Sequence, residues 1–208
     1  MKKLLHTSVA GLLIASALPA LAASTVDLTV KGLIVPSACT PSLSANTVDM
    51  GRVSVKDLNQ ESRTLLNPST LSLSVDCEAA TMFAMKATDN RTDSSANAGE
   101  FGIGKTAAGE PIGGYGLFLD NAVADAVAVQ TIVSYNGGTT WFTHYEDDLW
   151  QSTSLISIKA IGTASTPIPA KNTLMALSVN PFIHPAKNVT ISEDTAIDGL
   201  ATIEVKYL

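Results

Sequence analysis

Positive charge and long apolar stretches are scarce in this chain of 208 residues. The 13 Lys and Arg residues are outnumbered by 19 Asp and Glu residues, and they do not gather into a basic cluster. Nucleic-acid phosphates are bound by clustered Lys and Arg, so the composition argues against a nucleic-acid partner. No segment reaches the roughly 20 apolar residues that a membrane-spanning helix needs, so we also expect no membrane span.

Motifs of common enzyme sites are missing as well. The chain has no GxSxG nucleophile elbow, and only His144 and His184 follow the first 22 residues. THYEDD at 143–148 lacks the spaced oxygen ligands of a calcium loop, so a solvated acidic turn is expected there. His184 lies between prolines and is expected in a loop. We therefore predict no enzymatic activity and no catalytic, cofactor-binding or metal-binding residues.

The segment GEFGIGKT at 99–106 matches the nucleotide-binding pattern GxxxxGK[ST]. Such a loop binds phosphate only when it joins a buried strand to the N-terminus of a helix. The polar residues before it do not suit a buried strand, and the glycines and proline after it do not suit a helix. We therefore interpret residues 89–114 as a long, exposed and mobile loop.

The N-terminus has the pattern of a bacterial secretory signal peptide. Lysines at positions 2 and 3 precede an apolar run over residues 9–18, and an Ala-Leu-Ala cleavage box follows at 20–22. Removal of residues 1–22 would leave an exported chain with 11 basic and 19 acidic residues, and hence a net charge of −8.

The only two cysteines, Cys39 and Cys77, both belong to the exported part. An even number in an oxidising compartment predicts one disulfide bond, with two free buried thiols as the alternative. A bond across this separation of 38 residues would stabilise the fold by about 4 kcal/mol, because it restricts the unfolded chain.

Apolar and polar residues alternate with a period of two, which predicts β-strands. We expect strands at 25–35, 71–77, 82–88, 115–119, 154–162, 173–179 and 201–208. Clusters of turn-forming residues separate them, so the pattern predicts a single antiparallel β-sandwich. For residues 121–133, helix and strand both remain open.

The first and last of these strands have complementary patterns. One face of the first strand carries Val26, Leu28, Val30, Gly32 and Ile34. No tight turn returns this strand to the next one, so it can be a loosely attached arm. The last strand ends the chain, and one of its faces carries Ala201, Ile203, Val205 and Tyr207. Its outer edge is expected to lack a neighbour and can accept another strand.

The segment SYNGGTTW at 134–141 predicts a hairpin turn around Asn136, Gly137 and Gly138. With Asn136 in place of aspartate it also fits the Asp-box hairpins of sialidase propellers, although only one copy is present. A plain hairpin is our interpretation, and a glycan-related role is the alternative.

Together these motifs resemble the chaperone–usher pilins, which are subunits of bacterial fimbriae. The resemblance rests on the arm TVDLTVKGLIV before the first cysteine, on Cys77 at the end of a strand, and on the penultimate Tyr207. SYNGGTTW and IDGLATIEVKYL are more similar still to a poorly characterised, pilin-like branch of exported bacterial proteins (GltF-like).

This resemblance implies an all-β, immunoglobulin-like antiparallel β-sandwich that is incomplete because it lacks its last strand. In such pilins a periplasmic chaperone first lends a strand, and the arm of the next subunit later replaces it. By analogy, the apolar face of residues 26–34 would be inserted as the donor strand. Residues 201–207 would form part of the groove that receives it.

We therefore expect a signal peptide at 1–22, an N-terminal extension (donor strand) at 23–35 and a pilin-like domain at 36–208. The expected function is that of a structural subunit of a surface fimbria, or pilus, used in cell adhesion. Its expected partners are neighbouring pilin subunits, a periplasmic chaperone and an outer-membrane usher, and no cofactor is expected. The alternative is a periplasmic or secreted, self-complemented binding module with glycans as one candidate ligand, and an exported hydrolase is a third alternative.

Overall fold

The computed structural model describes residue 29, residues 38–95, residue 97 and residues 99–208. The chain divides into two units, residues 1–34 and residues 35–208, and all elements given below belong to the second unit. The expected signal peptide lies outside the described residues. The same holds for the expected donor-strand residues, which are Val26, Leu28, Val30, Gly32 and Ile34.

The described part of the chain is built from eleven β-strands and three short 3₁₀ turns, with no α-helix among the described residues. The strands are β1 (Cys39–Leu43), β2 (Thr64–Leu65), β3 (Ser69–Thr81), β4 (Phe83–Asp89), β5 (Phe101–Gly102), β6 (Gly113–Ala124), β7 (Val127–Ser134), β8 (Phe142–Thr143), β9 (Leu155–Ala160), β10 (Ala170–Ile183) and β11 (Ala201–Tyr207). The 3₁₀ turns are η1 (Val55–Asp57), η2 (Thr92–Ser94) and η3 (Ala186–Asn188).

Six of the expected strands are confirmed as β3, β4, β6, β9, β10 and β11. The ambiguous segment 121–133 contains the end of β6, a tight turn and most of β7, so it is not a helix. The short strands β1, β2, β5 and β8 were not expected, because none of them is long enough to show a clear alternation. Cys77 does not end its strand, since β3 continues to Thr81.

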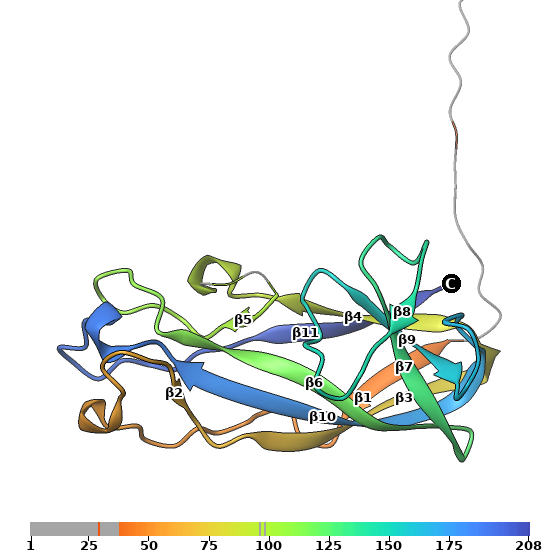
Figure 1. Cartoon of the computed structure of the whole chain (residues 1–208), viewed down its shortest axis with the longest axis horizontal. Coiled ribbons are helices and arrows are strands. Elements are labelled where there is room, and N and C mark those ends of the chain that lie inside the picture. Colours follow the sequence, from red (N-terminus) through yellow and green to blue (C-terminus); the bar gives the residue numbers. More distant parts are fainter. Residues whose placement is uncertain (1–28, 30–37, 96, 98) are drawn as a thin grey trace, which may run out of the picture. The chain divides into compact units, whose positions relative to one another are not determined.

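All neighbouring strands pair antiparallel, in the order β1-β3-β10-β6-β7-β9-β4-β11 (Figure 1). The first four strands form one layer of a sandwich and the last four form the other. The hairpin between β6 and β7 joins the layers through the pairs Val123–Ala128 and Ala124–Val127. The expectation of an all-β, immunoglobulin-like antiparallel sandwich is confirmed.

Alternate residues of the strands form the core between the layers. On β3, for example, Leu73, Val75 and Cys77 are buried, whereas the flanking Ser74 and Asp76 are not. This alternation is the one that predicted the strands. The largest fully buried apolar side chains are Trp150, Phe83, Phe101, Leu73, Met85, Leu119, Ile132, Ile156, Ile158, Met175 and Leu177.

Residues 89–114 do not form the exposed loop that we expected. Phe101 is fully buried and stacks on Tyr115 with 5.1 Å between the ring centroids. Ser94 and Thr106 are buried as well. Two short segments, η2 and β5, fold this part of the chain back onto β6, which the polar composition concealed. No helix follows Thr106, so the geometry of a phosphate-binding loop is absent here.

The expected hairpin at 134–141 is confirmed. It joins β7 to β8, and Gly137 and Gly138 adopt positive φ angles of 71° and 95°. The Asn136 Nδ2–H group donates a hydrogen bond to Thr140 Oγ1 across the turn. The solvated acidic turn expected at 143–148 is found only in part. Glu146 and Asp147 are exposed, but His144 is buried.

The turn between β6 and β7 is fastened by a carboxylate. Asp125 and Ala126 have positive φ angles of 49° and 65°. Asp125 accepts hydrogen bonds from the backbone N–H groups of Asn172 and Lys171 on β10. These bonds, led by the one from Asn172, lower the pKa of Asp125 although its partial desolvation acts the other way.

Candidate functional site: an open edge between β1 and β11

Strand β11 stands at one end of the strand order and pairs only with β4 among the described strands. Ala201, Ile203 and Val205 face the core, yet they are only half-buried. Their neighbours on β4, Phe83, Met85 and Ala87, are fully buried. The apolar face of β11 is therefore covered less completely than the rest of the core.

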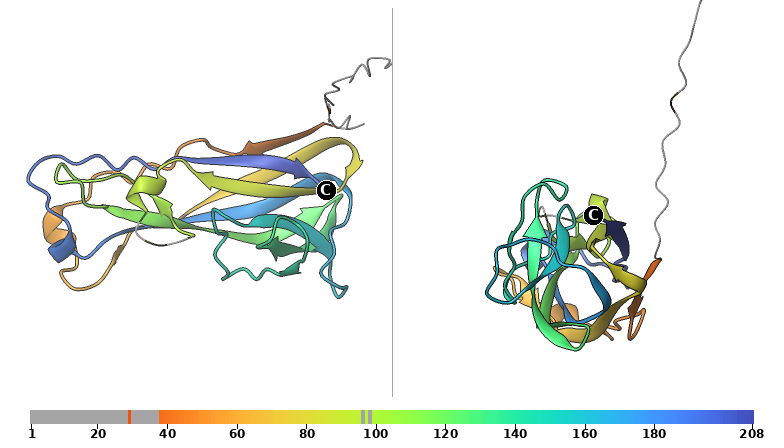
Figure 2. Two further views of the ribbon diagram at one scale, coloured as in Figure 1. Left: turned by 90° about the horizontal axis from the view of Figure 1, so that it is seen from above. Right: turned by 90° about the vertical axis from the view of Figure 1, so that its right-hand side faces the viewer.

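Strand β1 stands at the other end of the order and pairs only with β3 among the described strands. Its core-facing residues Cys39 and Leu43 are also half-buried. Seven antiparallel steps separate β1 from β11, so the two edge strands run in opposite directions. They lie side by side (Figure 2, left) without forming a ladder. Each strand thus offers one unpaired edge to the gap between them.

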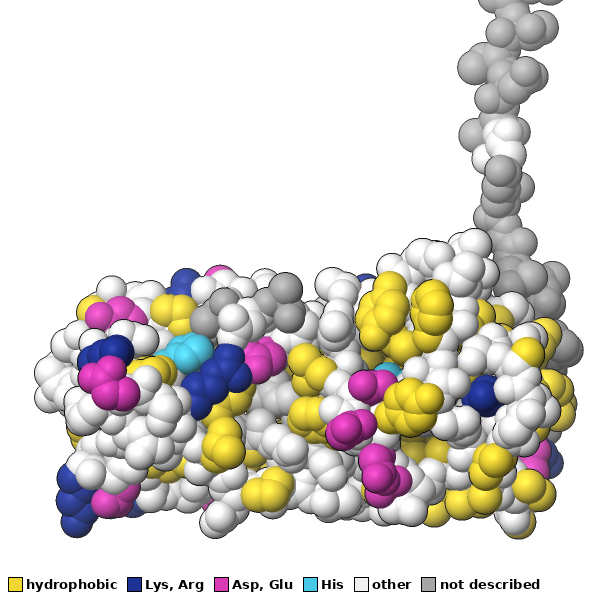
Figure 3. Space-filling model, in the orientation of Figure 1, with side chains coloured by type: hydrophobic (Ala, Val, Ile, Leu, Met, Phe, Trp, Pro, Cys, Tyr) yellow, Lys and Arg dark blue, Asp and Glu magenta, His cyan; other side chains and the backbone are white. Residues whose placement is uncertain are grey.

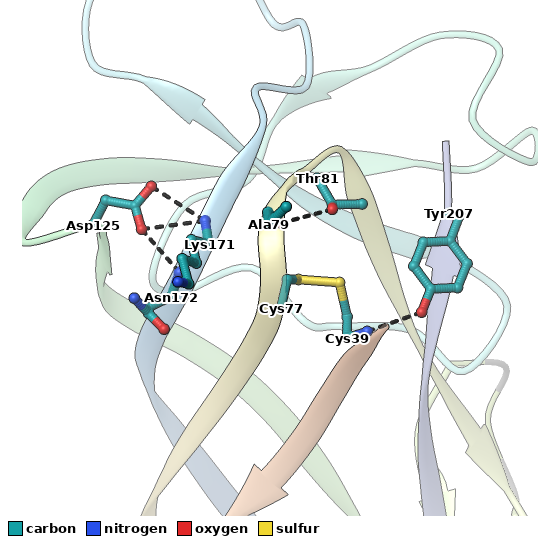
Figure 4. Close-up of a disulfide and its surroundings, with 8 residues drawn as sticks. All are labelled: Cys39, Cys77, Ala79, Thr81, Asp125, Lys171, Asn172 and Tyr207. Atoms are coloured by element: carbon teal, nitrogen blue, oxygen red, sulfur yellow. Dashed lines mark hydrogen bonds between the residues drawn. A yellow bond between two sulfur atoms is a disulfide. The ribbon is translucent and has the colours of Figure 1, made fainter. Parts of the chain in front are cut away.

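One end of this gap is fastened. The expected disulfide between Cys39 and Cys77 is confirmed, and it links the start of β1 to β3. The backbone N–H group of Cys39 donates a hydrogen bond of 2.9 Å to the Tyr207 hydroxyl at the end of β11 (Figure 4). The penultimate tyrosine therefore bridges the two edge strands at the end where β1 begins.

The opposite end of the gap widens into a cavity of about 1020 Å³, which we call the edge cleft. Residues 47–55, which follow β1, form one wall, and residues 191–197, which precede β11, form the other. Leu58, Ile112 and Ile183 also line the cleft and are buried in the core. The edge cleft thus joins the unpaired edges of β1 and β11 to the apolar interior.

The two walls carry few backbone hydrogen bonds. In residues 45–53, the one hydrogen bond described for a backbone group runs from Gly51 N–H to the Asp49 side chain. Residues 191–197 donate or accept no backbone–backbone bond among the described residues. The residues of both walls are exposed or half-buried, so an extended chain in the cleft could form hydrogen bonds with them.

The second wall is held at its two ends. Before it, the Thr190 backbone N–H and hydroxyl donate hydrogen bonds of 2.5 and 3.1 Å to the Glu110 carboxylate. The bond from the Thr190 backbone is the main reason why the pKa of Glu110 is lowered. After it, Asp198 N–H bonds to Ile103 O at 2.9 Å, and Asp198 pairs with Arg91 at 2.8 Å. Both ends of this wall are therefore held by bonds to other parts of the fold.

The sequence predicted only part of this site. It identified Ala201, Ile203, Val205 and Tyr207, which the structure places beside β1. It missed the cleft-lining residues Val48, Met50, Val53, Ile191 and Ile197, which lie outside regular strands. A weak signal was present, because Val48 and Met50 alternate with polar residues. That alternation is typical of a strand, yet no described strand pairs with it.

The described residues show neither a group of metal ligands nor a helix that could span a membrane. Among them, no three or more His, Cys, Asp or Glu residues are grouped so that they could hold a metal ion. No helix in the described part is long and apolar enough to span a membrane. His184 follows β10 and is half-buried, and its pKa is lowered by desolvation and by the nearby Arg63.

Two comparisons with known proteins found similarities, and neither of the printed descriptions states a function. Residues 28–100, which include β1 to β4, match a family described as "Protein of unknown function (DUF1120)". The chain is also 28% identical over 226 residues to "Uncharacterized protein YhcF" of Escherichia coli (strain K12). That similarity covers 92% of this chain and 94% of YhcF.

Proposed function

We propose that this protein is an exported structural subunit of a bacterial surface fibre, and that its subunits join by adding a strand to the edge cleft. The single observation that supports this most directly is the unpaired gap between β1 and β11, with half-buried apolar residues on both sides. The occupant would be residues 23–35 of a neighbouring copy, as in chaperone–usher pilins. A periplasmic chaperone would fill the same gap before assembly.

The apolar pattern of residues 23–35 suits this role. Val26, Leu28, Val30 and Ile34 share one face and could complete the core beneath the gap. If each is buried at about 1.5 to 3 kcal/mol, the apolar contribution is roughly 6 to 12 kcal/mol before the cost of ordering the strand. Main-chain hydrogen bonds to the two edges would add specificity for an extended segment.

The strand directions distinguish a gap filled by residues 23–35 of the same molecule from a gap filled by residues 23–35 of another molecule. Because β1 and β11 are antiparallel, an inserted strand is antiparallel to one of them and parallel to the other. Residues 23–35 of the same molecule directly precede β1, so folding back would place them antiparallel to β1 and parallel to β11. An added strand that is antiparallel to β11 must come from another molecule.

The test compares the exported chain with and without residues 23–35 by size-exclusion chromatography. We expect the complete chain to form oligomers and the shortened chain to remain a monomer that binds a peptide of residues 23–35. A Val30→Asp peptide should not bind, because it would bury a carboxylate. A complete chain that stays monomeric, with residues 23–35 packed on their own domain, would favour a self-complemented binding module instead.

A further inference from the structure

Large hydrophobic side chains are exposed at one end of the layer formed by β7, β9, β4 and β11. Val127 begins β7, Ile161 follows β9, Met82 precedes β4 and Leu208 follows β11. Each strand of this layer thus carries one such residue at this end, and the four side chains are between 43% and 65% exposed. We call these four residues the apolar rim.

Strand pairing places the residues of the apolar rim in neighbouring positions. Leu208 N–H donates a hydrogen bond of 3.2 Å to Met82 O. β9 pairs antiparallel with β4, and its last residue, Ala160, pairs with Val129 of β7, so Ile161 lies between the starts of β4 and β7. Figure 3 shows hydrophobic side chains gathered at the right-hand end of the unit, which is the end where Figure 1 marks the C-terminus. Groups of exposed hydrophobic residues mark interaction surfaces.

The apolar rim lies at the end of the sandwich where β1 begins. The hydrogen bond from Cys39 N–H to the Tyr207 hydroxyl holds the start of β1 beside the end of β11. The proposed donor strand, residues 23–35, is joined to Cys39 by residues 36–38 alone. The four steps from Val35 to Cys39 span about 14 Å at most. A molecule that receives the donor strand is therefore held close to the apolar rim of the molecule that donates it.

The receiving subunit has one open end for the connection to its neighbour. Its gap is closed at the rim end by the bond between Cys39 and Tyr207, and it widens into the edge cleft at the other end. Pairing antiparallel to β11 is favoured, because β11 has seven residues and β1 has five, and antiparallel ladders are slightly more stable. The added strand would then begin beside Tyr207 and leave through the edge cleft.

The length of the donated segment fits this path. β10 has 14 residues and runs from the rim end, where Ala170 pairs with Thr81, to the edge cleft, which Ile183 lines. Residues 25–38 also number 14, and an extended segment of this length spans about 46 Å. The segment thus reaches the far end of the receiving subunit without slack, and brings Cys39 of the donor there.

Hydrophobic side chains are exposed at this far end as well. Leu65 of β2 is exposed and pairs with Phe182 near the end of β10. Val55 of η1 is also exposed, and it lines the edge cleft together with Ile183, the last residue of β10. Both residues therefore lie at the opposite end of β10 from the apolar rim.

We propose that the apolar rim of one subunit packs against the end of the next subunit that carries Val55 and Leu65. The inference rests on the proposed strand addition and adds to it a second contact between two copies of the chain. Two different surfaces of the molecule meet in this contact, so it can repeat from copy to copy and extend a fibre. Burial of apolar side chains on both sides would make the joint tighter than the strand alone.

The test compares the unchanged sequence with the double variant Val127→Ser/Ile161→Ser in two measurements. Calorimetry measures how a peptide of residues 23–35 binds to the chain that lacks these residues, and we expect equal affinities. Size-exclusion chromatography follows the dissociation of oligomers of the complete exported chain on dilution. In the variant, we expect half-dissociation at a concentration at least about tenfold higher. Both side chains are exposed, so the variant should fold normally.

The matched control is Phe142→Ser/Tyr145→Ser, which removes two similarly exposed side chains outside the apolar rim. Phe142 pairs with Val133, at the opposite end of β7 from Val127. Weaker oligomers in the rim variant and unchanged oligomers in the control would support the proposal. Equal losses in both variants would overturn it, because they would reflect surface hydrophobicity in general.

The two measurements also distinguish this inference from the strand addition on which it rests. If the peptide binds but the rim variant forms oligomers as stable as those of the unchanged chain, the end-to-end contact is refuted and strand addition stands. If the rim variant binds the peptide more weakly, the apolar rim belongs to the groove of its own subunit, and the end-to-end contact is again refuted. If the peptide does not bind the unchanged sequence, strand addition fails and this inference fails with it.

Discussion

Moving residues 23–35 to the other end of the chain should fill the edge cleft of the same molecule. The altered chain would begin at Pro36 and carry residues 23–35 after Leu208, joined by a short turn. The added segment would then follow β11 as the second strand of a hairpin, antiparallel to it and parallel to β1. We expect this chain to be a monomer and to be more stable than the chain that simply lacks residues 23–35.

The contribution of the inserted strand to the unfolding free energy is best measured by a single substitution in the added segment. Val30→Asp there would lose about 1.5 to 3 kcal/mol of apolar burial and would add the cost of burying a carboxylate. We therefore expect a loss of at least about 3 kcal/mol of unfolding free energy. With a urea slope of about 1 to 3 kcal/mol per molar, the unfolding midpoint should fall by about 1 M or more.

Thr29→Asp in the same added segment is the matched control, because Thr29 lies on the opposite face of the alternating pattern. A carboxylate on a solvent-facing position should change the unfolding free energy by no more than about 0.5 kcal/mol. Urea unfolding followed by circular dichroism measures both variants. Equal effects of the two substitutions, or no gain in stability from the added segment, would refute strand insertion between β1 and β11.

Further predictions concern the fastened end of the gap and the turn between β6 and β7. Replacing both Cys39 and Cys77 with alanine should lower the unfolding free energy by about 4 kcal/mol in urea titrations; a loss below about 1 kcal/mol would contradict it. Tyr207→Phe should cost about 1 kcal/mol, because the Cys39 N–H group loses its partner, and an unchanged urea midpoint would show that the bond contributes nothing. The pKa of Asp125 is lower in the folded state than its ordinary value of 3.8, so its stabilising effect is present above that value and is lost as pH falls below it. Asp125→Asn should therefore flatten the acid side of the stability curve measured from about pH 6 to about pH 3, and a curve of unchanged slope would argue against it.

The strands were predictable from the sequence where each was long enough to alternate. β3, β10 and β11 show the pattern over six or more residues, and the structure has all three. The segment 89–114 was not predictable in this way. Its buried Phe101 lies in a strand of two residues. Polar groups nearby are paired by hydrogen bonds to residues well separated in sequence, such as the bond from Gly102 N–H to the Asp89 carboxylate. Local composition does not reveal such contacts between distant residues.

Of the candidate site, strand β11 was predictable from the sequence, and the wall formed by residues 47–55 was not. β11 was identified because Ala201, Ile203, Val205 and Tyr207 alternate with polar residues. The wall formed by residues 47–55 was missed because an unpaired extended segment has no turn signal and no alternating neighbour that would define it. His144 was misjudged for a related reason. Its sequence neighbours are acidic and exposed, but the backbone bond from His144 N–H to Thr131 O draws this one residue into the interior.

The gap between β1 and β11 follows from the way the two layers are connected. β6 and β7 are joined by a hairpin, so the sandwich is closed on that side by its own backbone. On the other side, the layers end in β1 and β11, and the hydrogen bond described between these two strands is the one from Cys39 N–H to the Tyr207 hydroxyl at one end. A sandwich closed at one side and fastened at one corner can admit a strand along the remaining edge without breaking any backbone pairing. Strand addition would therefore complete the core and leave the existing ladders intact.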